Sequence, residues 1–320
     1  MTTRSHSGAG LVSVAPGSAS LDVEQSIIPF HHALHEAALF SDAALARLID
    51  VHPRESIHIH HMSGTSEAPG YLDAMLGSIT GEEALAAIRR GKLWMSLIHI
   101  EQHGQYAELL HELYGQLERQ SQLRTLPASR LANLLISSPK AEVFYHADAQ
   151  HTALWHIRGE KRLLVYPPWD ERCLSRENRE LCLLGMLVDD LYKAEYDDLA
   201  AVFAMQPGDA VTWPHSTPHR VVNVSGLNVS LSTEHHTPAS RTRRQVAAAN
   251  WFFRNRLGVA TRSLEIEGLG AMTKRALYFG FRAAAKLLGR GTLVPRDPDV
   301  EATLCLDPRD PRGYTELGNA

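Results

Sequence analysis

A histidine and an aspartate separated by one residue, His146 and Asp148, follow an apolar stretch near the middle of the chain. Residues two apart on a β-strand face the same side, so an imidazole and a carboxylate would project into one space. This pair is two thirds of the 2-His-1-carboxylate triad that holds non-haem Fe(II) and leaves coordination positions open. A third donor must then come from a distant strand, which an antiparallel barrel supplies.

The third donor is expected after a Pro-Gly-Asp turn at 207–209. A short strand is predicted over 210–213 and a longer one over 221–231, with a proline-bounded loop between them. His219 stands where the second strand opens, and we rank it as the third ligand. His215 is the alternative and ranks second, because it lies inside the loop.

A lysine, Lys161, lies in the apolar segment 153–168. The pattern predicts a strand, a tight turn at Gly159, and a second strand that ends at a Pro-Pro pair. A lysine on the inner face of a barrel strand is costly unless an anion pairs with it. A dicarboxylate bound beside the metal would be such an anion. The alternative is a lysine at a hairpin edge that points into water.

These residues together resemble a known family. The stretch from Leu134 to Pro168 is similar to the JmjC and cupin-like 2-oxoglutarate oxygenases, including the asparaginyl hydroxylase that inhibits hypoxia-inducible factor. The shared features are a Leu-Leu-Ile segment that ends ten residues before His146, the His-x-Asp pair, a Gly-x-Lys, and an apolar run into Pro-Pro. The segment 207–234 resembles the family's closing strand pair.

The resemblance implies an Fe(II)- and 2-oxoglutarate-dependent dioxygenase. Such an enzyme would hydroxylate a C–H bond of a protein side chain or a small molecule and release succinate and CO2. Val143 stands where the relative has a threonine, and the relative's asparagine on the last strand has no clear match. The implied metal ligands are His146, Asp148 and His219; the implied cosubstrate residues are Lys161, Thr152, Ser230 and Ser232, with Glu234 as a further candidate for the last-strand position.

Two other functions stay open on the sequence. The first is a cupin-like binding or regulatory protein that has the barrel but does no oxygen chemistry. Barrels of this type host many functions, so the fold alone does not exclude it. The second is a metal-dependent cupin enzyme that does not use 2-oxoglutarate. Lys161 argues against this alternative, because such an enzyme would not need a cation to pair with the cosubstrate. The identity of the protein or small-molecule substrate is not indicated.

The composition argues against a nucleic-acid-binding, a secreted or a membrane-spanning protein. A net charge of −4 gives no electrostatic reason to expect a nucleic-acid partner. Three cysteines without a Cys-x-x-Cys pattern are typical of a reducing compartment, and no secretory signal is recognised, so a cytoplasmic location is expected. No run of about 18 apolar residues predicts a transmembrane helix.

The expected fold class is mixed α+β, with a double-stranded β-helix (jelly-roll or cupin) barrel. Residues 26–238 are expected to form this barrel with an N-terminal α/β buttress, interrupted by a helical insert at 178–204. Residues 1–25, rich in small polar residues, are expected to be a flexible arm. Residues 239–290 predict C-terminal helices, and 291–320 an irregular tail.

Local signals predict individual helices. Ser41 is expected to cap one helix, and Thr80 begins a capping box followed by a second. The acidic end of the insert, 189–198, is a candidate lid, although such patterns more often mark a solvated helix end. The pattern at 272–288 is basic on one side and aromatic on the other. It would pack on the barrel, form a homodimer interface or lie on an anionic membrane; dimerisation is preferred, because relatives often dimerise through such helices.

Overall fold

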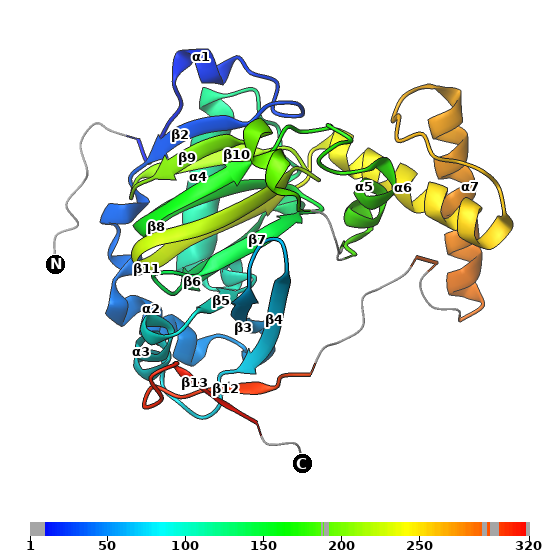
Figure 1. The fold of residues 1–320 in the computed structure, drawn as a ribbon. Coiled ribbons are helices and arrows are strands. Elements are labelled where there is room, and N and C mark those ends of the chain that lie inside the picture. The colour runs from blue at the N-terminus through cyan, green and yellow to red at the C-terminus, as the bar shows by residue number, and fades with distance from the viewer. Residues whose placement is uncertain (1–9, 187, 189–191, 290–292, 295–300, 318–320) are drawn as a thin grey trace.

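The fold is built on one large β-sheet that bends into a barrel (Figure 1). The computed structural model describes residues 10–186, 188, 192–289, 293–294 and 301–317. Within them, 13 strands form a single hydrogen-bonded sheet. The strands are β1 (Val12–Ser13), β2 (Ile28–His32), β3 (Ile57–Gly64), β4 (Pro69–Met75), β5 (Leu93–Leu97), β6 (Leu131–Ser137), β7 (Glu142–Ala147), β8 (His151–Val165), β9 (Ala201–Met205), β10 (Asp209–Trp213), β11 (Pro218–His235), β12 (Leu304–Leu306) and β13 (Tyr314–Glu316).

Two long strands, β8 and β11, hold the barrel together. They pair antiparallel with each other along most of their lengths. The first half of β8 pairs with β10 and the second half with β9. The first half of β11 pairs with β7 and the second half with β6. Each long strand therefore belongs to both faces of the barrel, which confirms the expected double-stranded β-helix within a mixed α+β fold.

The predicted tight turn at Gly159 is wrong, because β8 continues through this residue as one strand. Gly159 has a φ of +80°, a conformation that suits glycine. Across from it, the ladder with β11 shifts register between Ser225 and Val229. Gly159 thus marks an irregularity in a continuous ladder, and the pairing on both sides of it keeps the strand intact.

Helices cover the outer face of the sheet at the N-terminal end of the chain. The predicted caps are confirmed: the Ser41 side chain accepts from the Ala44 N–H, and Thr80 and Glu83 form a capping box. The helices are α1 (Pro16–Ala19), α2 (Asp42–Val51), α3 (Gly81–Arg90), α4 (Gly104–Gln120), α5 (Arg176–Leu184), α6 (Pro238–Leu257) and α7 (Gly268–Leu287).

The main hydrophobic core lies between these N-terminal helices and the sheet. Leu45 of α2, Leu85 of α3 and Leu113 of α4 are buried in one cluster with Met95 of β5 and Ile136 of β6. Burial of one such side chain contributes about 1.5–3 kcal/mol. The helices thus hold β5 and β6 firmly from outside, which leaves the opposite face of these strands free to line the barrel interior.

The insert between β8 and β10 is only partly helical. It contains α5 and a short 3-10 helix at Ala194–Leu199, but it ends in β9, which pairs with β8. The expectation of a helical insert over 178–204 is therefore wrong for its last residues, because 201–204 belong to β9 and complete the barrel wall. The acidic pair at 189–190, part of the candidate lid, lies outside the described residues.

Both terminal segments contain strands that the sequence did not predict. Residues 1–9 of the expected arm lie outside the described residues, but β1 follows them and pairs with β2. In the expected irregular tail, β12 pairs parallel with β4, and β13 pairs with β12. Pairing with distant strands, rather than local sequence, orders both segments.

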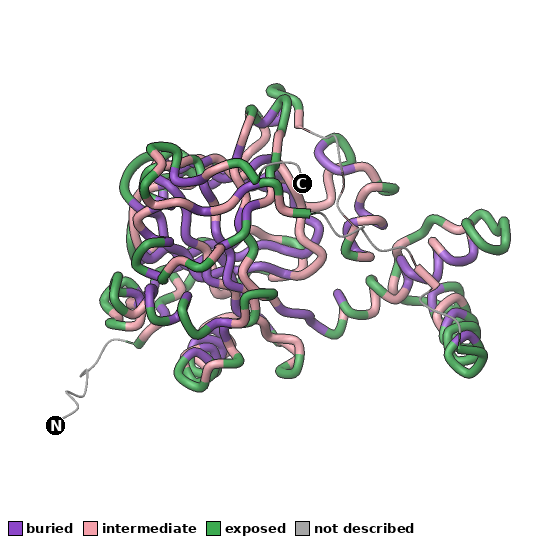
Figure 2. Tube along the Cα trace, turned by 90° about the horizontal axis from the view of Figure 1, so that it is seen from below, coloured by how far each residue is buried: buried purple, intermediate pink, exposed green. Residues whose placement is uncertain are grey.

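The last two long helices, α6 and α7, form a unit that we call the helix pair. They project from the barrel beside α5 (Figures 1 and 2). Phe252 and Phe253 of α6 and Tyr278 of α7 form a small core between the two helices. No helix among the described residues is long and apolar enough to cross a membrane.

Candidate metal and cosubstrate site

Two histidines are brought together by the pairing of β7 with β11. In the antiparallel ladder, His146 of β7 lies directly opposite His219 of β11. Cross-strand neighbours have Cβ atoms about 5 Å apart, so their side chains share one space. The two imidazole rings lie with their centres 4.2 Å apart. The ladder register therefore explains why residues 73 positions apart in sequence meet.

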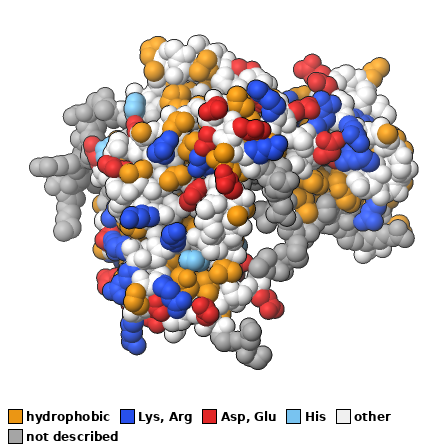
Figure 3. All heavy atoms as spheres, viewed as in Figure 1, with side chains coloured by type: hydrophobic (Ala, Val, Ile, Leu, Met, Phe, Trp, Pro, Cys, Tyr) orange, Lys and Arg blue, Asp and Glu red, His pale blue; other side chains and the backbone are white. Residues whose placement is uncertain are grey.

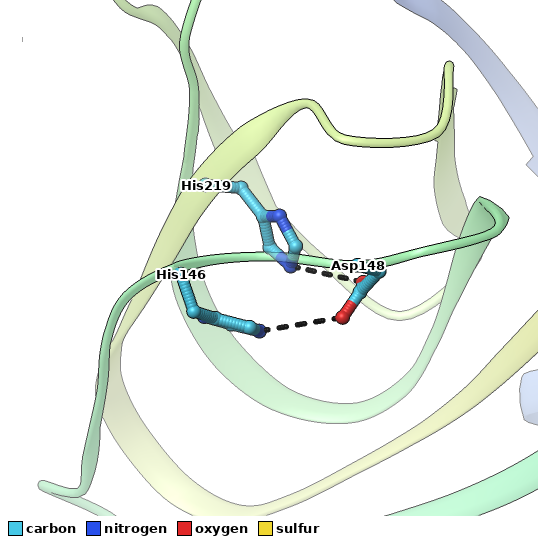
Figure 4. Close-up of side chains that lie close together, drawn as sticks. All are labelled: His146, Asp148 and His219. Atoms are coloured by element: carbon cyan, nitrogen blue, oxygen red, sulfur yellow. Dashed lines mark ion pairs between the residues drawn. The ribbon is translucent and has the colours of Figure 1, made fainter. Parts of the chain in front are cut away.

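Asp148 follows β7 directly and turns its carboxylate toward both rings (Figure 4). Its Oδ1 lies 3.8 Å from His146 Nε2, and its Oδ2 lies 3.5 Å from His219 Nε2. One donor atom from each of the three residues lies within 4.8 Å of the others. Two imidazole nitrogens and a carboxylate at this spacing fit a facial triad around one divalent ion.

Backbone hydrogen bonds orient both imidazoles. His146 Nδ1 lies 2.7 Å from the Phe144 carbonyl oxygen, and His219 Nδ1 lies 3.0 Å from the Thr217 carbonyl oxygen. A proton on each Nδ1 donates to its carbonyl and leaves Nε2 free as a metal donor. Burial lowers the pKa of His219 to about 4, so its ring is neutral at neutral pH, the form that binds a metal.

Neighbouring groups hold the aspartate. The Thr152 hydroxyl donates to Asp148 Oδ2 over 3.1 Å. The Ser216 N–H donates to the Asp148 carbonyl oxygen over 2.7 Å. Thr152, expected near the cosubstrate, therefore also contacts a candidate metal ligand directly. Such supporting hydrogen bonds fix the orientation of a ligand before a metal binds.

Lys161 lines the same cavity of about 300 Å³ as the three candidate ligands. Its side chain is buried, with 5% of the residue exposed, which excludes the alternative of a lysine that points into water. Burial lowers the pKa of Lys161 to about 7. Among the residues that the structure describes, no carboxylate pairs with this lysine; it donates instead to Ser230 Oγ, 2.9 Å away.

A short polar chain supports the lysine. Lys161 Nζ donates to Ser230 Oγ, which lies 3.1 Å from His156 Nδ1, and His156 Nε2 lies 2.8 Å from the Gly159 carbonyl oxygen. Burial and the charge of Lys161 lower the pKa of His156 to about 3, so His156 is neutral. With its own proton on Nε2, His156 accepts a hydrogen bond at Nδ1 from the Ser230 hydroxyl, and the Ser230 oxygen keeps its lone pairs for Lys161.

The structure separates the two candidates for the third ligand. His219 meets His146 and Asp148, whereas His215 is fully buried elsewhere, with its Nε2 3.0 Å from an Arg243 nitrogen. Ser232 lines the cavity, and Ser230 contributes through Lys161. His146, Asp148, His219, Lys161, Thr152 and Ser232 thus line one cavity, whereas His215 does not line it.

The wall of the cavity also contains three residues to which the sequence assigned no role, together with Glu234, the further candidate for the last-strand position. His58 and His60 of β3 and Trp94 of β5 line one side, and Glu234 at the end of β11 lies near Asp148. Burial and the Asp148 charge raise the pKa of Glu234 to about 7. The pairing of β3 with β5, and of β5 with β6, brings His58 and His60 to this cavity.

Comparison with known proteins places this architecture in a family. The model of the cupin-like domain family matches residues 80–256, more than half of the chain. No curated protein matches the sequence. Among solved structures, the chain is similar to Escherichia coli ycfD, with 13% identity and a TM-score of 0.48 over 85% of this chain and 69% of that chain.

Two further structures are similar. One is YcfD, a ribosomal oxygenase from Escherichia coli in complex with cobalt and 2-oxoglutarate, with 14% identity and a TM-score of 0.45 over 81% of this chain and 63% of that chain. The other is the DMSP lyase DddQ from Ruegeria pomeroyi, with 13% identity and a TM-score of 0.23 over 34% of this chain and 40% of that chain. By the family match, which spans the barrel and the site, the chain belongs to the cupin-like domain family.

Proposed function

We propose that this protein is an Fe(II)- and 2-oxoglutarate-dependent dioxygenase that hydroxylates a C–H bond of a protein side chain or a small molecule. Succinate and CO2 would be the coproducts. The observation that carries the proposal is the shared cavity: a His-Asp-His cluster and a buried lysine without an acidic partner in the described chain line the same space. A dicarboxylate that bridges the two would satisfy both.

The donor set fits a ferrous ion. His146, Asp148 and His219 would hold it, and the free Nε2 atoms and the carboxylate are the donors that this ion takes in facial triads. When bound, the ion supplies the activation of dioxygen that accompanies oxidative decarboxylation of the cosubstrate. The aspartate also partly neutralises the ion, because it is the one anionic side chain of the three.

The chain's own residues would position 2-oxoglutarate. Lys161 would pair with the carboxylate farthest from the metal, held in place by Ser230. The Trp213 Nε1–H is buried and has no hydrogen-bond partner in the described part of the chain, and its ring lines the same cavity. This orphaned donor is a second group that a bound anion would satisfy. Val143, Leu154 and other apolar side chains of the lining would limit access of water.

The substrate would contact the part of the cavity wall that the metal ligands and Lys161 leave free. This wall includes the imidazoles of His58 and His60, the Trp94 indole and polar groups of Asn133 and Glu234. Asn133 donates to the Glu234 carboxylate over 2.8 Å. A wall of aromatic and hydrogen-bonding groups suits a polar side chain or a compact metabolite rather than a long alkyl chain.

The experiment is succinate formation from 2-oxoglutarate by the full-length protein supplied with Fe(II) under air, together with anaerobic titration of Fe(II) and 2-oxoglutarate. The wild type should form succinate and develop the weak visible absorption of the chelate. Asp148→Ala should lose both. Glu108→Ala, at an exposed carboxylate of α4 outside the cavity, is the matched control and should retain both. Turnover in Asp148→Ala equal to that of the control would refute the proposal.

A further inference from the structure

The helix α7 buries only a narrow stripe of its surface. Ala271, Tyr278 and Ala285, spaced seven residues apart, are its buried residues. The cations lie beside this stripe: Lys274 donates to Asn250, and Arg275 donates to Gln245, both on α6. At 3.6 residues per turn, the remaining arc of the helix, opposite the stripe, contains no charged residue.

That charge-free arc is exposed and apolar. Leu269 is 82% exposed and Leu287 is 87% exposed, at opposite ends of the helix. Figure 2 shows the outer side of the helix pair in the colour of exposed residues, away from the barrel. An apolar face of this length on a projecting helix is rare unless something covers it. Its large exposed side chains are Leu269, Met272, Leu277, Phe279 and Leu287. Phe281, at the edge of the arc, is also partly exposed but contacts Phe252 of α6.

Charge is strongly segregated between the helix pair and the rest of the protein. Residues 238–289 contain ten lysines and arginines against two acidic residues, a net charge of +8, within a chain whose net charge is −4. Figure 3 shows these cations beside apolar side chains on the visible face of the helix pair. Two of the arginines, Arg254 and Arg262, pair with acids of α5. Arg282 and Lys286 are exposed and have no ion-pair partner among the described residues.

We propose that the helix pair is a membrane-association module, in which α7 lies in the plane of an anionic lipid bilayer. The outer arc would enter the boundary between headgroups and acyl chains, and Arg282 and Lys286 would contact lipid phosphates. A helix with an uncharged apolar face and flanking cations has the properties of an interfacial helix. Each Lys or Arg near an anionic leaflet adds about 1 kcal/mol of attraction.

Charge and exposed apolar surface disfavour two other partners for α7, a second copy of the chain and a nucleic acid. A second copy that packed α7 against α7 would bring together two basic units, each of net charge +8, or +6 once the α5 acids paired with Arg254 and Arg262 are counted, and like charges across an interface disfavour association. A nucleic acid would satisfy the cations but leave Leu269, Phe279 and Leu287 in water. A lipid surface satisfies both the cations and the apolar arc.

The test is flotation of the full-length protein with vesicles of phosphatidylcholine alone and with vesicles in which roughly a third of the lipid is phosphatidylglycerol. The wild type should bind the anionic vesicles and not the neutral ones, and salt should weaken binding. The double variant Leu269→Glu/Leu287→Glu should reduce partitioning at least about tenfold, because each leucine loses apolar burial. Both positions are highly exposed, so the fold should be retained.

Val51→Glu is the matched control, because Val51 is an exposed apolar residue on α2, far from the helix pair, and it should not change partitioning. Arg282→Glu/Lys286→Glu should abolish the preference for anionic lipid. Binding to neither vesicle, or equal binding by the leucine double variant, would overturn the proposal. A wild-type dimer in sedimentation that becomes a monomer in the leucine double variant would also overturn it. So would binding of single-stranded RNA that persists in the leucine double variant and that vesicles displace poorly.

Discussion

Replacement of Lys161 by methionine should make the protein without ligand more stable. Burial lowers the pKa of this lysine from 10.5 to about 7, so at pH 7 and below the folded state carries an unfavourable buried cation. The pKa difference sets an upper limit of roughly 5 kcal/mol on this cost. Methionine keeps most of the apolar length and removes the charge, and we expect a gain of a few kcal/mol in the free energy of unfolding at pH 7.

The same change should weaken 2-oxoglutarate binding. A dicarboxylate in the cavity would lose its cationic partner, and removal of one member of a buried, hydrogen-bonded charge pair costs about 2–5 kcal/mol. The dissociation constant should therefore rise at least about 30-fold. In the wild type, affinity should fall as the pH rises above about 7, because the lysine of the free protein then loses its proton. The variant should lack this pH dependence.

Urea unfolding with Mn(II), in the presence and absence of 2-oxoglutarate, measures both the free energy of unfolding and the stabilisation that 2-oxoglutarate binding adds. Between pH 7 and 10.5 the unfolded state binds more protons at Lys161, so this group makes wild-type stability rise with pH, and the variant should lack that contribution. Lys92→Met, at an exposed lysine outside the cavity, is the control. A Lys161→Met protein that is less stable at pH 7 and is still stabilised by 2-oxoglutarate to the wild-type extent would refute the reasoning.

Four further substitutions have defined outcomes. His219→Ala should lower bound Fe(II) at least about tenfold by metal analysis, whereas His215→Ala should lose stability but keep the metal; the opposite pattern would reverse the assignment. Ser230→Ala removes the acceptor of Lys161 and should weaken 2-oxoglutarate binding about five- to tenfold by calorimetry, and an unchanged affinity would remove Ser230 from the site. Gly159→Ala should cost about 1–3 kcal/mol in thermal unfolding, because its φ is +80° and a Cβ would meet Asn228 at 2.8 Å; a neutral result would show that the ladder relaxes there.

The parts of the fold with local signals were predictable. The caps at Ser41 and Thr80 depend on side chains within four residues of the helix start, so the sequence shows them directly. His146 and Asp148 share a side because they are two residues apart at the end of one strand. His219 required one further step, that a distant strand pairs with the first, and the turn and the prolines before it narrowed the choice.

The remaining features depend on pairing between distant strands. Gly159 looks like a turn residue, yet it lies inside β8, because partners on both sides keep the strand continuous. The three-residue strand β12 has too little sequence to identify it, and β4 determines its conformation. The place of His58 and His60 in the cavity wall follows from the strand order β6-β5-β3, which no local pattern encodes.

The tail that contains β12 reaches the cavity through one intermediate strand. The Thr303 N–H donates to the Asp73 carbonyl oxygen of β4, and the Asp73 carboxylate lies 2.5 Å from His60 Nδ1. Truncation of the chain before residue 303 would remove β12 and leave β4 as an unpaired edge strand, which could pair with other chains. It would also weaken the support that Asp73 gives to the His60 imidazole in the cavity wall. The shape of the cavity therefore depends on residues more than 200 positions downstream of His60.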